Sequence, residues 1–545
     1  MIVEDEFLDQ KSHNYVLALA RGPEKLGLAY LDISTGTFRI CESSEAEWIL
    51  EESLRVGPSE LILPNSSQED GGFQRIVACH DGKALTFLDD RDFEYARGRE
   101  RLLAQFGTVS LDGFGCEGMR AAISAAGALA GYVQETQKRA IRHLHGLEAY
   151  HLGHHLWVDE LSCRNLELFK NIRTGTRRGS LLGILDQTVT AMGGRLFKQW
   201  LRYPLRDARE IELRLGALEE AKRQMAIRDQ LRDHLKSVYD LERLGSKIAM
   251  GQANARDLVA LKRSIQTLPT ILELLAPLES RLLRWPQPPE ALFALADLIE
   301  QAIREDAPPI VSEGGMIREG FDERLDDLIR ISRDGKGFLA ELEAKEKSAT
   351  GINTLKVRYN KVFGYYIEVS KHQSAAVPAH YVRKQTLVNA ERYITDELKS
   401  FEMKVLGAEE QRAILEGEIF NRIRQQVVVH HKAVQDAAMA VARLDCLSAL
   451  ADVADHNGYV RPEINEEGRI LIEEGRHPVV EKMLSGERFV PQQRSYGRRG
   501  QSGADHHRTQ YGRQVDRFTA GGHIGHHGSD RIIHTGRPGL HLPDR

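Results

Sequence analysis

The sequence predicts a multidomain protein of the α/β plus mostly α class, and three patterns lead to this prediction. Short apolar runs separated by turns fill residues 1–135. From about Leu161 onward, apolar side chains recur three and four positions apart, which is the period of a helix with one buried face. Residues 354–371 return to the alternation of strands. We therefore expect a small α/β domain, a body of long helices, and a helix–β segment inserted into that body.

The composition favours several soluble domains without a global charge signal. A chain of 545 residues is long enough for about three or four domains. The formal net charge is −5, so any binding of nucleic acid must come from a local patch. The five cysteines never form a C-x-x-C pair, which argues against a zinc site or disulfide scaffold and suits a reducing cytoplasm. No apolar run spans a bilayer and no secretory signal opens the chain, so we expect a cytoplasmic protein without a membrane partner.

The first domain combines strands with interleaved helices. Asp32 ends its second apolar run, directly before the turn residues Ser34, Thr35 and Gly36. One interpretation is a catalytic carboxylate on a strand, and the favoured one is a carboxylate that caps the turn. The predicted elements are strands at 15–20, 26–33, 37–40 and 60–64 and a helix at 46–55.

Amphipathic helices are expected to dominate residues 161–305 and 391–455. Arg195 and Lys198 are expected on the solvent-facing side of one helix, and Pro269 is expected to interrupt another. Between these regions, a long charged helix from Leu325 to Lys347 is a candidate arm that leads to the strands at 354–371. Further strands at 470–472 and 479–480 begin a new domain that stops at Pro491.

The strongest candidate for chemistry is a basic segment between Thr354 and Lys399. It contains eight positive and four negative side chains, a balance of +4 in a chain whose total is −5, with aromatic residues interleaved. Such side chains can hold backbone phosphates without reading bases. The alternative is a solvated sheet whose aromatic residues fill a small core. The candidate DNA contacts are Lys356, Arg358, Asn360, Lys361, Arg383, Lys384, Gln385, Asn389 and Arg392.

Other candidate sites are weaker. His477 precedes Pro478 in a turn, where a structural role is favoured over a catalytic one. The histidine pairs at 506–507 and 526–527 resemble metal ligands, but a shifted reading frame accounts for them. No paired carboxylates, Ser/His/Asp or Cys/His arrangement has suitable spacing. We therefore expect no catalytic, cofactor or metal site in the chain as written, and whether it is an enzyme stays uncertain.

The 54 residues from Gln492 to Arg545 predict a change of reading frame. They contain no Lys and no Glu, but hold seven of the 21 histidines, ten glycines and nine arginines. Codons for Arg508 to Arg517 can be read one base later as Gly-Pro-Asn-Met-Ala-Gly-Lys-Ser-Thr, a phosphate-binding loop of the form G-x-x-x-x-G-K-[ST]. Flanking codons can hide the strand before this loop and the helix after it. We expect a lost ATPase domain and a foreign, disordered tail.

Eight segments resemble the MutS family of DNA mismatch-repair ATPases. They follow the order of the family and cover roughly residues 1–491, which makes the resemblance specific. The hidden phosphate-binding loop also stands where this family carries one. The segments are LDISTG at 31–36, RNLEL at 164–168, GILDQTVT at 183–190, MGGRL at 192–196, YNKVFGYYI at 359–367, RKQTL at 383–387, NAERYI at 389–394 and GRHPVV at 475–480.

The resemblance implies a connector domain followed by a helical core whose long levers carry a clamp domain. In the family, two subunits close their clamps around double-stranded DNA through backbone contacts, and the basic segment matches the clamp. It also implies a homodimer, a MutL-type partner, and ATP with Mg²⁺ as cofactors of the intact family. The expected domains are the connector at 1–135, the core at 136–285 and 425–458, the clamp and lever insertion at 286–424, the start of a P-loop ATPase domain at 459–491, and the tail at 492–545.

Two departures limit what the resemblance implies. We expect the family's mismatch-reading domain to be missing before the connector, and the ATPase domain to stop after its first strands. In the translated frame, Gly512-Arg513-Gln514 replaces the Lys and the Ser or Thr that the phosphates and Mg²⁺ need. We therefore expect a MutS-type mismatch-repair protein that keeps only weak, non-specific clamping of duplex DNA, with impaired dimerisation and no ATPase activity.

Three alternatives stay open from the sequence. One is a helical interaction or scaffold protein that binds no nucleic acid, and charge reversal at Arg383 and Lys384 would separate it from a DNA clamp. Another is a MutS relative that acts on branched or recombination DNA, which fits the missing reader domain. The segments 359–367 and 389–394, however, resemble the mismatch-repair branch. The third is a non-functional fragment.

Overall fold

The computed structural model describes residues 9–137, 144, 146–285, 288–310, 314–360, 364–467, 470–483 and 492–496. The chain divides into two compact units, one of Met1–Ile464 with His477–Phe489 and the other of Asn465–Arg476 with Val490–Arg545. Lys361, Phe363 and the tail beyond Tyr496 lie outside the described residues, so the predictions made for them stay predictions.

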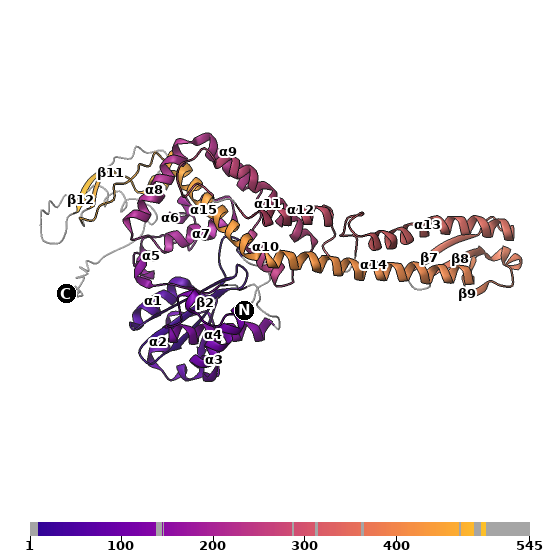
Figure 1. Cartoon of the computed structure of the whole chain (residues 1–545), viewed down its shortest axis with the longest axis horizontal. Coiled ribbons are helices and arrows are strands. Elements are labelled where there is room, and N and C mark those ends of the chain that lie inside the picture. Colours follow the sequence, from indigo (N-terminus) through magenta and orange to yellow (C-terminus); the bar gives the residue numbers. More distant parts are fainter. Residues whose placement is uncertain are drawn as a thin grey trace, which may run out of the picture. The chain divides into compact units, whose positions relative to one another are not determined.

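A six-stranded mixed sheet is the centre of the N-terminal α/β domain (Figure 1). Its strands are β1 (Val16–Arg21), β2 (Leu26–Asp32), β3 (Thr37–Ser43), β4 (Glu60–Pro64), β5 (Ala84–Leu88) and β6 (Glu148–Ala149). The strand order is β5-β4-β1-β2-β3-β6; β1, β2 and β3 run antiparallel, whereas β4 pairs parallel with β1 and β5, and β6 pairs parallel with β3. The strands and helix expected in the first 64 residues are confirmed, and β5 and β6 are additions.

Helices cover both faces of this sheet. On one face, α1 (Ala46–Val56) and α2 (Gly71–Cys79) pack against Leu17 and Leu19 of β1. On the other, α3 (Tyr95–Phe106) and α4 (Arg120–Gln137) pack against Val16 and Ala18. The side chains on both faces of β1 are therefore apolar, as in a strand that is buried between two helical layers. Gly27 permits this packing, because a Cβ there would lie 2.0 Å from the carbonyl carbon of Ala121.

Most of the remaining helices form a helical body around one large apolar cluster. Pro269 lies inside α11 and does not interrupt it, so that expectation is wrong. The proline removes one amide donor, but Leu268 and Ile271 beside it are fully buried, and this packing outweighs the missing hydrogen bond. The helices around this cluster are α7 (Ala191–Arg202), α8 (Ala208–Arg223), α9 (Met225–Leu235), α10 (Leu241–Ala249), α11 (Ala255–Leu275), α12 (Glu290–Ala302) and α15 (His431–His456). A smaller cluster joins α6 (Leu181–Leu185) to α7 and α15, and α5 (Glu160–Asn165) contacts α1.

A buried carboxylate fixes the start of α7. Asp445 on α15 accepts the amide N–H groups of Val189 (3.0 Å) and Thr190 (2.7 Å) and the Thr190 hydroxyl (2.6 Å). Thr190 in turn caps α7 by accepting the Gly193 amide at 2.9 Å. These bonds join residues that are about 255 positions apart.

The expectation that Arg195 faces solvent is wrong. The side chain of Arg195 is 1% exposed, and it donates hydrogen bonds to Asp240 and Glu242 at 2.6 Å each. Lys198 is also largely buried, with a side-chain exposure of 26%. The sequence shows a polar helix face, but the segment Asp9–Asn14 and the α/β domain cover this face of α7.

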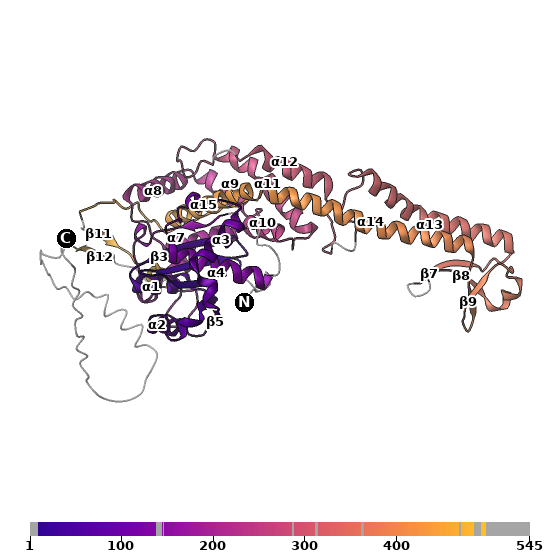
Figure 2. The same cartoon turned by 60° about the horizontal axis from the view of Figure 1, so that its bottom comes forward.

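An arm of two long helices carries a second sheet. Helix α13 (Glu323–Thr350) packs along α14 (Asp396–Val429), as Figure 2 shows. The predicted charged helix is confirmed as α13. The helix expected from residue 391 starts later, because Ala390–Ile394 forms a strand and the Thr395 hydroxyl caps α14 by accepting the Leu398 amide.

The region after the body differs from expectation in two places. The predicted strand at 470–472 is confirmed as part of β11 (Ile470–Gly475), which pairs antiparallel with β12 (Gln492–Tyr496). The first five residues of the predicted disordered tail are thus a strand. The strand expected at 479–480 is wrong, because these residues belong to helix α16 (Pro478–Met483). Pro478 suits the first position of a helix, where its missing amide donor costs nothing. Short 3-10 helices lie at Asn65–Gln68, Asp90–Phe93, Asp112–Phe114, Leu152–His154 and Lys371–Ala376.

Candidate nucleic-acid interface

The basic segment folds into a four-stranded antiparallel sheet at the end of the arm. Its strands are β7 (Lys356–Asn360), β8 (Gly364–Ser370), β9 (Val382–Thr386) and β10 (Ala390–Ile394), in the order β7-β8-β10-β9. One face packs on the arm helices through a small core that includes Leu342, Leu355 and Leu398. Ile367, Val369, Tyr393 and Ile394 are the buried strand residues of that core. Ile367 and Val369 alternate along β8 and Tyr393 is paired with Ile367, so the positions between them point to the opposite, outer face.

One row of polar residues crosses all four strands on the outer face. Lys356 is paired with Glu368, Glu368 with Arg392, and Arg392 with Gln385. The Arg392 guanidinium donates to Gln385 Oε1 at 2.8 Å, lies 3.5 Å from Glu368 and sits 4.3 Å above the Tyr366 ring. Arg358 lies 3.6 Å from the same carboxylate. The outer face therefore holds its two arginines in place around one acid.

The basic side chains of this sheet differ in their exposure to solvent. Arg392 has a side-chain exposure of 17%, whereas that of Arg358 is 50%. Lys356 is exposed, and so is Lys384, which occupies a bulge where the register of β9 against β10 shifts. A bulge re-aims the side chain that it carries. Lys356, Arg358 and Lys384 are thus exposed cations in or beside this row, whereas Arg392 is held between Gln385 and Glu368. Arg383 is also exposed, at 61%, but it does not belong to the row.

Other predicted contacts are placed elsewhere. Arg383 is paired with Tyr393 and lies 3.5 Å from Glu391, on the helix-facing side of the edge strand rather than with Arg358. Asn389 is exposed in the turn between β9 and β10, and Asn360 ends β7 at its turn toward β8. The structure thus brings Lys356, Arg358, Gln385 and Arg392 together and separates Arg383 from them.

Most aromatic residues of the sheet fill its small core, as the alternative to DNA binding predicted for them. Tyr366 is 5% exposed beneath Arg392, and Tyr365 packs against Phe401 with ring centroids 5.8 Å apart. They fill the sheet and its core, while Tyr359 is 52% exposed. Sequence reasoning missed the role of Glu368, and only its cross-strand register with two basic strands could have indicated it.

Buried tyrosines stabilise the base of this sheet. The Tyr393 hydroxyl donates to Glu391, and burial together with this bond raises the pKa of Tyr393 to about 12. Tyr381 donates to Glu346 at 2.6 Å, and burial likewise raises the pKa of Tyr381. Both phenols stay protonated at neutral pH and remain hydrogen-bond donors.

Asp32 has the turn-capping role that was favoured. Its carboxylate accepts the Ser34 amide at 3.0 Å and the Ser34 hydroxyl at 2.7 Å. Burial acts to raise the pKa of Asp32, but hydrogen bonds from His13 and Ser34 outweigh it and lower the pKa to about 2. His477 precedes α16, and its carbonyl accepts the Glu481 amide. Among the described residues, no group of three His, Cys, Asp or Glu side chains could hold a metal ion.

The fold and this interface define a multidomain protein in which an α/β domain and a helical body carry an arm with a basic sheet. No helix in the described part of the chain is long and apolar enough to cross a membrane. Residues 14–145 match the family model of MutS domain II, and residues 162–451 match that of MutS domain III. The chain belongs to the MutS family.

Curated relatives agree with this assignment. The protein from Desulfatibacillum aliphaticivorans is 51% identical over 492 residues, which are 90% of this chain and 55% of the relative. That from Desulfosudis oleivorans is 50% identical over 496 residues, covering 90% and 56%. That from Symbiobacterium thermophilum is 43% identical over 495 residues, also covering 90% and 56%. Each is named DNA mismatch repair protein MutS. The chain spans a little over half the length of these relatives.

Proposed function

We propose that this chain is a DNA mismatch-repair protein of the MutS type and that its arm is a clamp that binds the backbone of double-stranded DNA. The observation that carries the second part is the outer face of the β7–β10 sheet, where Lys356 and Arg358 are exposed around a fixed network, together with Lys384, which is exposed in the bulge of β9 next to Gln385. Family membership and the names of the relatives support the first part.

The chemistry of this face suits phosphates rather than bases. Exposed cations on a flat antiparallel sheet can reach phosphate oxygens, whereas reading of base edges requires an element that enters a groove. Each phosphate that is neutralised releases counterions, so the affinity should fall steeply with salt. Glu368 and Gln385 keep Arg392 and Arg358 ordered, which lowers the entropy lost on binding.

A triple substitution tests the clamp. In the variant Lys356→Gln, Arg358→Gln, Lys384→Gln, we expect non-specific binding of a fluorescent duplex to weaken and the slope of log K against log salt to become less negative by about 2 to 3. Fluorescence anisotropy at several salt concentrations measures both quantities.

The matched control removes three cations elsewhere, by Lys83→Gln, Lys236→Gln, Lys432→Gln. These lysines lie on the α/β domain and the helical body and are exposed. If the two triple variants lose the same affinity, binding follows net charge and the arm is not the clamp. If neither loses any, the scaffold alternative is favoured.

Further properties are proposed from family membership alone. A homodimer, a MutL-type partner and residence in the cytoplasm follow from membership in the family. ATP and Mg²⁺ belong to the intact family, and we propose no described residue of this chain as their ligand.

A further inference from the structure

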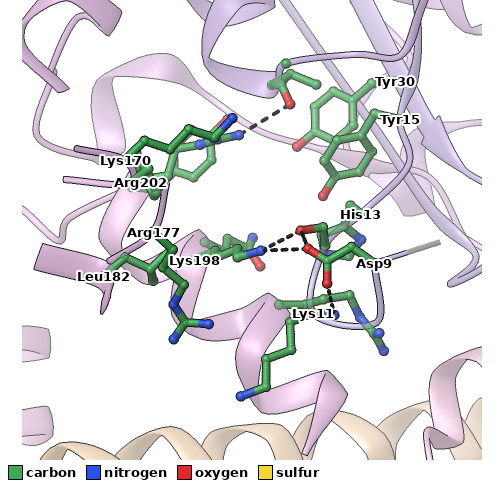
Figure 3. Close-up of a pocket in the computed structure, with 17 residues that line it drawn as sticks. Asp9, Lys11, His13, Tyr15, Tyr30, Lys170, Arg177, Leu182, Lys198 and Arg202 are labelled. Atoms are coloured by element: carbon green, nitrogen blue, oxygen red, sulfur yellow. Dashed lines mark hydrogen bonds and ion pairs between the residues drawn. The ribbon is translucent and has the colours of Figure 1, made fainter. Parts of the chain in front are cut away.

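A cavity of about 530 Å³ lies between the α/β domain and the helical body (Figure 3). It is remote in sequence from the arm and has no part in the proposed clamp. Its walls are the segment Asp9–His13, Tyr15 and Tyr30 of the sheet, the stretch from Phe169 to Arg177, and one face of α7. A cavity of this size accommodates a ligand about as large as a nucleotide.

The face of α7 in this cavity is cationic. Arg195, Lys198, Gln199 and Arg202 follow one another at spacings of three, one and three residues, so they share one side of the helix. Arg195 is neutralised by Asp240 and Glu242 behind it. Lys198 lies 3.5 Å from Asp9 and donates a hydrogen bond to the Ser12 hydroxyl, and burial lowers its pKa.

Residues outside α7 add more positive charge to the cavity. The described residues that line it include six Lys or Arg side chains and one carboxylate, Asp9. Arg177 and Lys11 share Asp186, at 2.7 and 3.7 Å. Within the described part of the chain, Lys170 and Arg202 make no ion pair with a carboxylate, although both line the cavity. Arg202 instead donates to the carbonyl of Val56 and lies over the Phe169 ring.

Aromatic groups complete the walls. Figure 3 shows Tyr15 and Tyr30 on the side across from Lys170 and Arg202, with Lys198 between the two groups. Burial raises the pKa of Tyr15, so its hydroxyl keeps its proton, and it makes no hydrogen bond to another described residue. His13 stacks on Tyr15 at 4.8 Å, and the Phe169 ring lines the other wall. The cavity thus offers cations and a donor for an anion beside flat apolar surfaces.

We propose that this cavity binds a small phosphate-bearing anion of nucleotide size. Lys170, Lys198 and Arg202 contact the phosphate oxygens, and the Tyr15 hydroxyl donates to them. Because the ligand contacts both the sheet and α7, its binding also fastens the α/β domain to the helical body.

Titration calorimetry on the full chain tests the site, with sodium pyrophosphate and ADP as separate probes and without added metal. We expect both probes to bind, and Lys170→Gln to weaken each at least tenfold, because Lys170 lines the cavity and makes no ion pair with a carboxylate of the described residues. Arg202→Gln should have a similar effect. The control Lys83→Gln removes an exposed lysine of the α/β domain that does not line the cavity and should change nothing.

The outcomes are distinct. Tighter binding of ADP than of pyrophosphate identifies a nucleoside phosphate, and equal binding identifies the phosphate group alone; both support the site. The proposal is overturned if neither probe binds, or if Lys170→Gln binds both as tightly as the unchanged chain. Arg202 also packs on Phe169, so circular dichroism checks the fold of that variant, and Lys170→Gln decides the matter alone. None of these readouts depends on the arm, so they are independent of the DNA-binding test.

Discussion

Glu368 sets the charge of the outer face of the arm sheet, because it lies between Arg358 and Arg392. In the proposed clamp, the carboxylate would have two opposing effects on DNA binding. It orders both arginines, and it repels phosphates. Arg392 is also held by Gln385 and Tyr366, so its order survives without the acid, whereas Arg358 loses its ion pair. We expect the relief of repulsion to outweigh the order that Arg358 loses.

We therefore expect Glu368→Gln to strengthen duplex binding about threefold at low salt, measured by fluorescence anisotropy. The control Glu397→Gln removes an exposed carboxylate of α14 that is paired with Lys345, away from the outer face. If both variants strengthen duplex binding equally, the change follows the net charge of the chain and not the position of Glu368. If Glu368→Gln weakens binding, Glu368 does not act mainly by repelling phosphates.

At the scale of elements, regular periodicity was sufficient for the long helices and the central strands. The α13 helix and the strands β1 to β4 follow from apolar spacing in the chain. The start of α14 did not follow, because the helical pattern after residue 395 extends by chance into Ala390–Ile394. Cross-strand pairing with β8 and β9 decides that these five residues form a strand, and such pairing is not visible in a local pattern.

The Thr395 cap marks this boundary and can be tested. Its hydroxyl accepts the Leu398 amide at 3.2 Å in a buried setting. We expect Thr395→Ala to destabilise the first turn of α14 by about 1 kcal/mol, seen as faster hydrogen exchange at the arm end of the helix. Thr395→Ser keeps the hydroxyl and should preserve protection. Unchanged exchange in the alanine variant would show that the sheet alone holds this turn.

At the scale of the whole molecule, the similarity to relatives covers most of the chain, and the last 54 residues differ in composition from the rest. The aligned segment of the D. aliphaticivorans relative is 492 residues long and covers 90% of this chain. We propose that a changed reading frame after Pro491 causes the absence of Lys and Glu beyond it.

The nucleotide sequence around the codon of Pro491 tests this explanation. Read one base later, it should encode the Gly-Pro-Asn-Met-Ala-Gly-Lys-Ser-Thr loop and continue as an open frame. A stop codon or an unrelated sequence in that frame would refute it. Resequencing from an independent sample then distinguishes a change in the gene from an error in its sequence.

The sequence by itself determined the α/β and helical regions, the basic character of the arm tip and the resemblance to MutS. These depend on residue type, period and order along the chain. Tertiary structure alone decided which cations work together. Arg195 is buried by segments distant in sequence, Arg383 is turned away from Arg358 by strand register, and Lys170 and Arg202 lie on one side of a cavity across from Tyr15 and Tyr30. Side-chain surroundings arise from contacts between distant segments, and a local pattern carries no information about them.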